Sequence, residues 1–446
     1  MSDSLHVLVL TAGKGSRMKS NLAKVLHPLG HAPLVYHVLA AARALCPATL
    51  TCVTGHDADR VEQALETWAP DVRTVRQGLQ TGTGAAVRDG LSLLPPDGHL
   101  LVLFGDSPLI TPDTLAAMHA TARSGAQCVV LGFRPSDPGR YGRLVERNGL
   151  LEAIVEDADA TPEQRRGAQC NGGAMLLDIS AAHRHLPRIL PSPGTGEIYL
   201  TDIVRLLRAE GGDMRVHSCP EKETLGVNTQ RELAYAEAVF QARRRDEFLD
   251  AGVRMPAPET VHFAHDTRID AGAIIEPYVV FGPGVMVAAG AHIRPFCHIE
   301  GASLDTGAVI GPYARLRPHT RLDARARAGN FVEIKNARIG PESKVNHLSY
   351  IGDAEIGAHA NIGAGTVTCN YDGVSKHHTR IGQRAFVGSG TMLVAPVEVG
   401  AGALTAAGST ITRSVPDDAL AIARSRQTTL AGRARALFDR LRRGRA

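Results

Sequence analysis

Short apolar runs and helical patterns alternate over the first 228 residues of the chain. Leu5 to Leu10 is one apolar run, Pro33 to Leu45 follows a helical pattern, and further apolar runs begin at Thr49 and His99. Alternation of this kind predicts βαβ units and a mainly parallel sheet. Ligands of such sheets bind beyond the carboxyl ends of the strands. We therefore expect the chemistry of this half in the loops that follow Leu10 and Phe104.

A different pattern begins after Pro258, where an aliphatic or small residue recurs at every sixth position. Six residues is neither a helical nor a simple strand period. It fits a solenoid in which each hexad forms one flat side of a triangular prism and points its aliphatic residue inward, so the sequence predicts a parallel β-helix. The inward positions form three registers: Ile269, Ile275, Phe281, Val287, Ile293 and Ile299; Ile310, Leu316, Leu322, Ala328 and Ile334; and Ile381, Val387, Leu393, Val399, Thr405 and Ile411.

The hexad pattern is disturbed at three places. The steps from Ile334 to Ile339 and from Ile351 to Ile356 are one residue short, and the residues from Cys369 to Arg380 (CNYDGVSKHHTR) interrupt the pattern. A solenoid accommodates an interruption as a loop thrown outward from a corner. This loop is either a plain surface insertion or, as its Asn, Tyr, Lys and paired His favour, a binding loop.

A helical, charged segment from Thr229 to Leu249 separates the two patterns, and the proline-containing AGVRMPAPET ends it. The length of 446 residues also favours two domains, because a single core rarely grows beyond roughly 250 to 300 residues. We expect a first domain over residues 1–228, a helical linker over 229–252, and a β-helical domain with a C-terminal tail over 253–446.

Composition and charge narrow the class of protein. Hydrophobic residues at 44% and charged residues at 21% are ordinary for a globular chain. The sequence has neither an apolar run of roughly 20 residues nor a secretory signal, so we expect a cytoplasmic protein without membrane partners. The net charge of +4 gives no reason to expect nucleic-acid binding, and the seven cysteines lack metal or redox spacing. The Arg-rich end (ARARALFDRLRRGRA) is either a solvated tail or a lid over an anionic ligand.

The loop after Leu10 reads TAGKGSRMKSNLAKVLHPLG. Gly13 and Gly15 come directly after the expected strand, where glycine lets backbone N–H groups approach phosphates closely. Arg17 and Lys24 follow as cations that either neutralise phosphates or are simply solvated. The spacing matches neither a Walker loop nor a dinucleotide fingerprint.

This loop resembles the signature of the sugar-1-phosphate nucleotidyltransferases. Within them, the phrases QTGTGAA, FGDSPL, RYGRLVE, AIVEDADAT, NGGAMLLD, GEIYLTD and GVNT, in this order, resemble the bifunctional N-acetylglucosamine-1-phosphate uridylyltransferase/glucosamine-1-phosphate N-acetyltransferases. The resemblance runs from about Leu5 to Arg426. It implies an α/β Rossmann-like nucleotidyltransferase domain followed by a left-handed parallel β-helix, assembled as a homotrimer.

The resemblance also implies two reactions. Acetyl-CoA would acetylate glucosamine 1-phosphate, and UTP with Mg²⁺ would then convert the product, N-acetylglucosamine 1-phosphate, into UDP-N-acetylglucosamine for cell-wall biogenesis, releasing pyrophosphate. For the second reaction it assigns Arg17 to the triphosphate, Lys24 to the reacting phosphates, and Asp106 with Asn228 to the metal, which favours such hard oxygen donors. Without the resemblance, Asp106 would equally suit a helix cap.

Further residues of the first domain are assigned to the two substrates. Phe104 and Thr11 stand where the family usually has Tyr and Ala, which would affect nucleotide affinity rather than activity. The nucleotide contacts are Leu10, Ala12, Gly13, Lys24, Gln77, Gly82 and Thr83, and the sugar-phosphate contacts are Gly142, Glu156, Asn171, Tyr199, Thr201 and Asn228.

Acetyl transfer to an amine needs a base, because the substrate ammonium has no free electron pair. A histidine, with an ordinary pKa near 6.5, can take that proton at physiological pH. The resemblance gives this role to His347 in KVNHLSYIGDAEIG; a lone histidine on a β-helix face would otherwise be structural. It assigns glucosamine 1-phosphate to Arg317, Lys335, Tyr350, Asn361 and Lys376, and acetyl-CoA to Ala364, Asn370, Tyr371, Ser389, Ala407 and Arg424.

Position along the solenoid adds two expectations. Arg317 and Lys335 are about one coil apart, so they should stack on one side of the prism, with His347 on a neighbouring side. Inward hexad residues cannot reach solvent, so acyl-CoA should bind outside the prism, in grooves between packed prisms.

Two other functions fit parts of the sequence. The first is a monofunctional nucleotidyltransferase whose β-helix is structural or regulatory. His347, Asn361 and the loop from Asn370 to Lys376 argue against it. The second is a non-catalytic assembly protein on the same scaffold. The presence of Arg17, Lys24, Asp106 and Asn228 speaks against that function.

Overall fold

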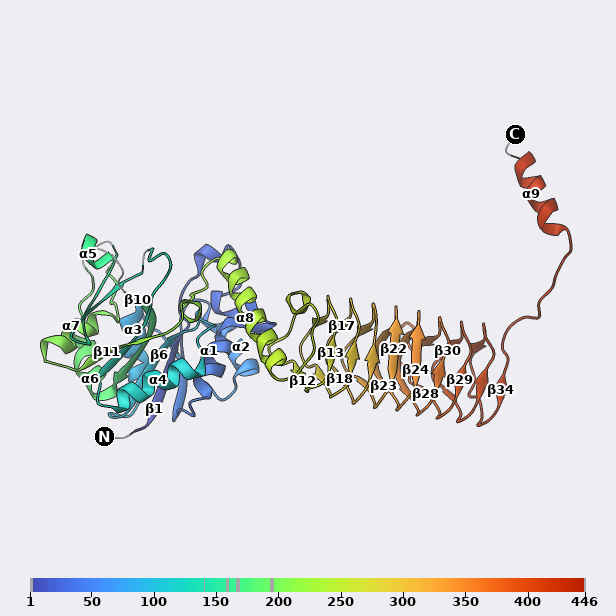
Figure 1. Ribbon diagram of the computed structural model, residues 1–446, viewed down its shortest axis with the longest axis horizontal. Coiled ribbons are helices and arrows are strands. Elements are labelled where there is room, and N and C mark those ends of the chain that lie inside the picture. Colours follow the sequence, from blue (N-terminus) through green and yellow to red (C-terminus); the bar gives the residue numbers. More distant parts are fainter. Residues whose placement is uncertain (1–2, 140, 158–159, 166–168, 193–195, 445–446) are drawn as a thin grey trace. The chain divides into compact units, whose positions relative to one another are not determined.

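The computed structural model describes residues 3–139, 141–157, 160–165, 169–192 and 196–444. Two compact units, Met1–Arg244 and Arg245–Ala446, have separate hydrophobic cores and are described one at a time (Figure 1). The division falls within helix α8 (Gln230–Asp250), inside the segment expected as a helical linker. The expected boundaries at 228 and 252 stay predictions.

The first unit is an α/β domain built on a twisted sheet with the strand order β11-β7-β10-β6-β1-β4-β5. Helices α1, α2 and α4 contribute to the core on one face, and α3, α6 and α7 to the core on the other. The elements are β1 (Leu5–Leu10), the 3₁₀ helices η1 (Ser16–Met18) and η2 (Lys24–Leu26), β2 (Pro28–Leu29), β3 (Ala32–Pro33), α1 (Leu34–Arg43), β4 (Thr49–Thr54), α2 (Ala58–Trp68), β5 (Arg73–Arg76), α3 (Thr83–Leu91), β6 (His99–Phe104), α4 (Pro112–Arg123), β7 (Cys128–Phe133), β8 (Arg143–Arg147), β9 (Leu150–Val155), α5 (Pro162–Arg165), β10 (Gln169–Asp178), α6 (Ile179–His185), η3 (Leu186–Arg188), α7 (Asp202–Ala209), β11 (Met214–Ser218) and η4 (Glu221–Glu223).

The central strand β1 explains why the first loop and the loop after Phe104 belong to one site. All six residues of β1 are buried, because helices cover both faces of the sheet. The strand pairs in parallel with β4 and β6, and Leu10 lies opposite Phe104 at its end. Only β10 runs against its neighbours in the main path, and β8 and β9 form a hairpin beside it. The predicted α/β sheet, with both loops at its carboxyl edge, is confirmed.

The second unit is a parallel β-helix, as the six-residue period predicts. Each short strand pairs in parallel with the strand one coil later, so that Ile275 lies on Ile293 and Ile293 on Ile310. All residues of the three predicted registers are buried. The elements are η5 (Pro258–Thr260), β12 (Arg268–Ile269), β13 (Ile274–Ile275), β14 (Val280–Phe281), β15 (Met286–Val287), β16 (His292–Ile293), β17 (His298–Ile299), β18 (Ala302–Leu304), β19 (Val309–Ile310), β20 (Arg315–Leu316), β21 (Thr320–Leu322), β22 (Arg327–Asn330), β23 (Glu333–Ile339), β24 (Lys344–His347), β25 (Tyr350–Ile356), β26 (Asn361–Ile362), β27 (Val367–Cys369), β28 (Thr379–Ile381), β29 (Phe386–Val387), β30 (Met392–Val394), β31 (Val397–Val399), β32 (Leu404–Thr405), β33 (Thr410–Ile411), β34 (Leu420–Ala421) and α9 (Arg433–Arg443).

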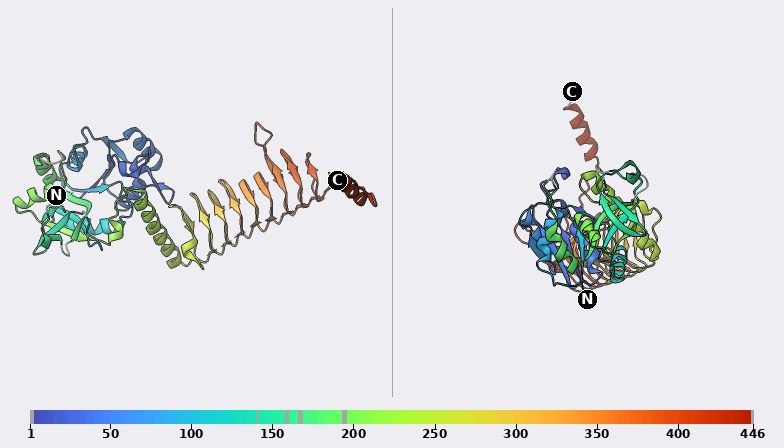
Figure 2. Two further views of the ribbon diagram at one scale, coloured as in Figure 1. Left: turned by 90° about the horizontal axis from the view of Figure 1, so that it is seen from above. Right: turned by 90° about the vertical axis from the view of Figure 1, so that its left-hand side faces the viewer.

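The disturbed hexads have distinct structural causes. At the two shortened steps, β23 and β25 run around a corner as single strands, and each turns at one residue of positive φ, Asn336 at 45° and Asp353 at 47°. The longer interruption is a loop that stands out from the coil (Figure 2), closed by an antiparallel bridge between Tyr371 and Lys376. The prediction of an outward loop is confirmed.

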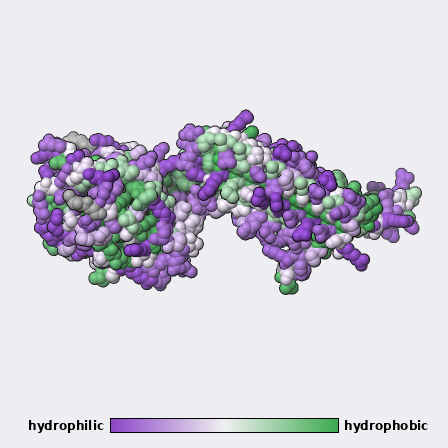
Figure 3. All heavy atoms as spheres, turned by 90° about the horizontal axis from the view of Figure 1, so that it is seen from below, coloured by the Kyte–Doolittle hydropathy of each residue, from purple (hydrophilic) through white to green (hydrophobic). Residues whose placement is uncertain are grey.

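Apolar side chains also lie outside the coil. Tyr278, Phe296, Tyr313 and Phe331 stack along one corner with ring centroids 5.0, 4.8 and 5.3 Å apart, and each is about half exposed. Figure 3 shows apolar atoms among polar ones on one face of the molecule. Every described residue of α9 is exposed, and none of the described helices is long and apolar enough to cross a membrane.

Candidate active sites

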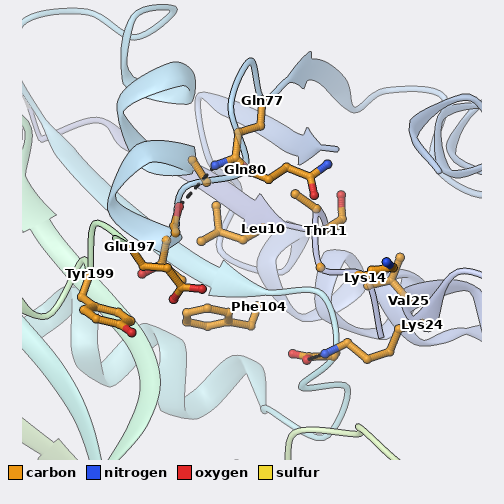
Figure 4. A pocket seen from close by; sticks show the side chains of 16 residues that line it. Leu10, Thr11, Lys14, Lys24, Val25, Gln77, Gln80, Phe104, Glu197 and Tyr199 are labelled. Carbon is orange, nitrogen blue, oxygen red and sulfur yellow. Dashed lines mark hydrogen bonds and ion pairs between the residues drawn. The ribbon is translucent and has the colours of Figure 1, made fainter. Parts of the chain in front are cut away.

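A pocket of about 440 Å³ opens at the carboxyl edge of the sheet in the first unit. Figure 4 shows Lys14 and Lys24 at one end and Glu197 and Tyr199 at the other, with Phe104 between them. Nine of the predicted site residues line it: Leu10, Ala12, Gly13, Lys24, Gln77, Gly82, Thr83, Asp106 and Tyr199.

Lys24, Asp106 and Asn228 meet at one point, although they come from distant parts of the chain. The Lys24 ammonium forms an ion pair with the Asp106 carboxylate and donates a hydrogen bond to Asn228 Oδ1 at 3.0 Å. The backbone N–H of Val227 donates to the Asp106 carbonyl at 2.8 Å, which ties the Asn228 segment to the end of β6. A carboxylate and an amide oxygen that already converge on a cation are a suitable pair of ligands for Mg²⁺.

The loop before α3 forms another wall of the pocket. Gln77 Nε2 donates to the Gly82 carbonyl at 3.2 Å, and Thr83 Oγ1 accepts from the backbone of Leu200 at 3.0 Å. Gly82 has a φ of 112°, and a Cβ there would lie 2.6 Å from the Ile198 carbonyl. Only glycine therefore allows this loop to pack against the segment that carries Tyr199.

Three of the predicted sugar contacts form a second group. Gly142, Glu156 and Asn171 are adjacent: a Cβ on Gly142 would lie 3.5 Å from Glu156 Oε1 and 3.8 Å from Asn171 Cβ. Phe104 lines the pocket and also lies near this group. Its ring is 3.3 Å from where a Cβ on Gly173 would be, and Gly173 lies in β10 two residues after Asn171.

Some predicted residues lie outside this pocket, and some of its residues were not predicted. Gly142, Glu156, Asn171, Thr201 and Asn228 do not line it, and Arg17 is exposed in η1. Lys14, Gln80 and Glu197 line it but were missed. Lys14 stands between the two loop glycines. Gln80 is the first residue of the quoted phrase QTGTGAA, and Glu197 lies in GEIYLTD, so these phrases were a sequence signal that could have identified them.

In the second unit, three cations stand close together. Arg317 donates its backbone N–H to Ile334, directly before Lys335, so these two residues stack one coil apart as expected. Lys376 from the projecting loop is so close that it lowers the pKa of the Lys335 ammonium, and the charge of Arg317 adds to this effect. Glu333 pairs with Arg317 at 2.9 Å. The mutual repulsion of Arg317, Lys335 and Lys376 favours the binding of an anion among them.

Asp353 lies buried beside the cations. Burial acts to raise the pKa of its carboxyl, but hydrogen bonds from Asn336 and Asn370, with the charges of Lys376 and Lys335, lower it overall. The side chain of Asn370 is thereby fixed at the root of the loop, while Tyr371 is exposed further out.

Tyr350 lies against the same place. A Cβ on Gly352 would lie 2.5 Å from Tyr350 Oη and 2.8 Å from Asn370 Nδ2, so the absence of a side chain at Gly352 allows the two groups to meet. Asn361 lies apart from them, beside Lys344 on the neighbouring side of the prism.

His347 ends β24 on that neighbouring side. Its Nδ1 lies 2.7 Å from Oδ1 of Asn330, the residue one coil below. Because an amide oxygen only accepts, Nδ1 carries the hydrogen in the neutral ring, and the free electron pair is on Nε2.

A ladder of backbone hydrogen bonds continues from His347 along one corner. Gly365 N–H donates to the His347 carbonyl at 3.1 Å, Gly390 to Ala364 at 2.7 Å, and Gly408 to Ser389 at 2.8 Å. Arg424 Nη1 donates to the Ala407 carbonyl at 2.7 Å. The residues predicted to contact acetyl-CoA on the coil therefore form one line that begins at His347: Ala364, Ser389, Ala407 and Arg424.

The fold and pocket of the first unit define the class of nucleotidyltransferases. Residues 7–170 match the family model of the MobA-like NTP transferase domain. Among solved structures, a putative glucose-1-phosphate thymidylyltransferase from Bacillus anthracis, in complex with a sucrose, covers 53% of this chain and 95% of its own at 19% identity and a TM-score of 0.44.

Curated relatives match nearly the whole chain. Proteins named "Bifunctional protein GlmU" are 53% identical in Jannaschia sp. (strain CCS1), 51% in Paracoccus denitrificans and 52% in Dinoroseobacter shibae; each match covers 98% of this chain and 96 to 97% of the relative. The chain belongs to the GlmU family. It is a bifunctional enzyme of UDP-N-acetylglucosamine biosynthesis, with the uridylyltransferase and acetyltransferase activities expected from the sequence.

Proposed function

We propose that the pocket of the first unit transfers a uridylyl group from UTP to N-acetylglucosamine 1-phosphate. The observation that carries this assignment is the convergence of Lys24, Asp106 and Asn228 at the edge where the glycine loop ends. Joining two polyanions requires their charge to be neutralised and the attacking and leaving oxygens to be held in line. Lys24 supplies positive charge, and Asp106 and Asn228 would hold Mg²⁺, which would neutralise further charge at the phosphates when bound.

The remaining walls divide between the two substrates. Gln77, Gly82 and Thr83 hold the uracil, for which amide and backbone groups of a packed loop are suited. Glu156, Asn171 and Tyr199 hold the sugar, whose hydroxyl and acetamido groups need acceptors and donors. Arg17 lies on the exposed side of the glycine loop and contacts the triphosphate.

On the coil, we propose that His347 is the base for acetyl transfer to glucosamine 1-phosphate. Nε2 takes a proton from the substrate ammonium, and the free amine attacks the thioester carbonyl carbon. The C–S bond then breaks, the coenzyme A thiolate takes up the proton held by His347, and the new amide nitrogen releases its second proton to solvent. Arg317, Lys335 and Lys376, whose positive charges stand close together, hold the sugar phosphate with Tyr350. Asn361 completes the sugar site.

Acetyl-CoA lies along the ladder from Ala364 to Arg424, with Asn370 and Tyr371 at its acetyl end. The line starts at His347 and runs outside the prism, which supports this placement. We also propose a homotrimer, because the half-exposed aromatic stack from Tyr278 to Phe331 needs covering. Since UTP and acetyl-CoA are cytoplasmic metabolites, we place the enzyme in the cytoplasm.

The two sites are tested by separating the two activities. Lys24→Ala should lower uridylyl transfer, measured as pyrophosphate release, by at least about 100-fold and leave acetyl transfer, measured as thiol release, unchanged. His347→Ala should do the reverse. His298→Ala, a change at an exposed histidine elsewhere on the coil, is the control and should alter neither rate. Parallel loss of both activities in either variant would contradict the assignment.

A further inference from the structure

Three metal-ligating side chains meet at the end of the sheet opposite the pocket. Asp3 lies just before β1, His99 is the first residue of β6, and His119 is on α4. One carboxylate oxygen of Asp3 and one ring nitrogen of each histidine all lie within 4.8 Å of one another. Within the described residues, no other three His, Cys, Asp or Glu side chains are grouped in this way.

Each of the two histidines has a ring nitrogen that makes no hydrogen bond. Nδ1 of His99 and Nε2 of His119 are buried without a hydrogen-bond partner, which a buried polar atom rarely is. Burial lowers the pKa of both rings, which favours their neutral form. A neutral imidazole has the free electron pair that a metal needs.

The surrounding charge and space also suit a cation. The negative charges of Asp178 and Asp3 act on His99, and Asp3 acts on His119. The opposing group is Arg123, which pairs with Asp3 at 2.8 Å and whose charge acts on both rings. A hollow of about 750 Å³ is lined by Asp3 and His99 but not by His119, so a hydrated ion can reach the first two ligands. Its charged lining comprises the cations Arg123 and Arg184 and the carboxylates Asp3, Asp178, Glu210 and Asp213, so acidic groups outnumber basic ones.

We propose that Asp3, His99 and His119 bind one divalent transition-metal ion, with Zn²⁺ as the preferred ion. Two imidazoles and one carboxylate form a ligand set that Zn²⁺ accepts, with water in the fourth position. Zinc–ligand bonds of about 2.0–2.2 Å require the three donor atoms to move closer together by rotation of their side chains, and Arg123 to release Asp3.

The ion joins the segment before β1 to β6 and α4, so its role is structural. Leu5 pairs with His99 at one end of β1, and Leu10 pairs with Phe104 at the other. At about 3.3 Å per residue, the length of the strand separates the metal site from the pocket by roughly 17 Å. Uridylyl transfer should therefore not depend directly on the ion bound at Asp3, His99 and His119.

Binding is tested on the full chain after treatment with EDTA. Zn²⁺ titrated calorimetrically in saturating Mg²⁺ should bind with one tight equivalent per chain, and Co²⁺ should give the visible absorption of a low-coordinate site. His99→Gln and His119→Gln should each weaken Zn²⁺ binding by more than about 100-fold, since even outer contacts of a metal site cost about 10- to 100-fold. His298→Gln, in the other unit, is the matched control and should bind as the unchanged chain does.

If a histidine substitution disturbs folding, a variant that is expected to bind Zn²⁺ more tightly still tests the proposal. Arg123→Gln removes the cation that competes for Asp3, so Zn²⁺ binding should strengthen several-fold. Uridylyl transfer should keep its rate in all of these variants. The absence of a tight equivalent, equal affinity in all variants, or weaker binding in Arg123→Gln would overturn the proposal.

Discussion

Gly15 provides a test of how closely the glycine loop positions Lys24. It lies directly before η1 with a φ of 59°, in the left-handed region. A Cβ at this position would lie 2.6 Å from Lys24 Cβ, 3.4 Å from its Cγ and 3.5 Å from its Cδ. The nearest atom is thus at the base of the lysine side chain, where rotation about the outer bonds gives no relief.

The effect of Gly15→Ala has two parts. The left-handed conformation costs an alanine about 1 kcal/mol, which for a domain of this size lowers Tm by about 2–4 °C. In addition, Lys24 Cβ must retreat by about 0.8 Å to reach an ordinary contact of 3.4 Å. Displacement of a catalytic group by about 1 Å can cost about 100-fold in rate. We expect uridylyl transfer to fall by about 10- to 100-fold with only a small loss of stability.

The assay compares pyrophosphate release, thiol release and thermal unfolding on one preparation. Gly78→Ala is the matched control, because a Cβ there meets nothing within 4 Å and Gly78 has no positive φ. It should change none of the three measurements. If Gly15→Ala kept uridylyl transfer within two-fold of the unchanged enzyme, the loop would not position Lys24. If thiol release fell in parallel, the effect would be a general loss of folded protein.

Two further predictions concern the coil. Asn330→Ala removes the acceptor that orients His347, so kcat of acetyl transfer should fall by about 10-fold with little change in KM. Asn330→Asp keeps an acceptor and should restore part of kcat. A change in KM alone would contradict an orienting role. The pKa of Asp353 is lowered in the folded state, so its contribution to stability is complete above the unfolded value of about 3.9 and is lost as the pH falls further. Urea unfolding of the unchanged chain should therefore weaken more steeply below pH 4 than that of Asp353→Asn, and equal slopes would show that Asp353 does not carry this dependence.

Much of the fold follows from local sequence patterns. The unbroken apolar run of β1 predicts a strand covered on both faces, and the hexad period predicts a coil whose inward residues, such as Ile293, are buried. The sequence also indicated that the interruption between Cys369 and Arg380 leaves the coil. The shortened hexads, in contrast, gave no sign that β23 and β25 would continue around a corner, because a missing residue can be absorbed in several ways.

The candidate sites depended more strongly on resemblance than on pattern. Nothing local to Asn228 indicates that it meets Lys24, which is 204 positions away. Lys14 and Glu197 lie within the glycine loop and the phrase GEIYLTD, so the sequence marked their segments, but which side chain of each segment faces the pocket depends on packing.

The sequence by itself determined the two repeating architectures, because strand, helix and hexad periods are local properties that any coil or sheet must satisfy. Only the tertiary structure decided which side chains share a site. The order of the strands places the ends of β1 and β6 side by side, and one coil of the prism places His347 over Asn330. The same folding brings Asp3, His99 and His119 together at the far end of the sheet, although no motif connects them.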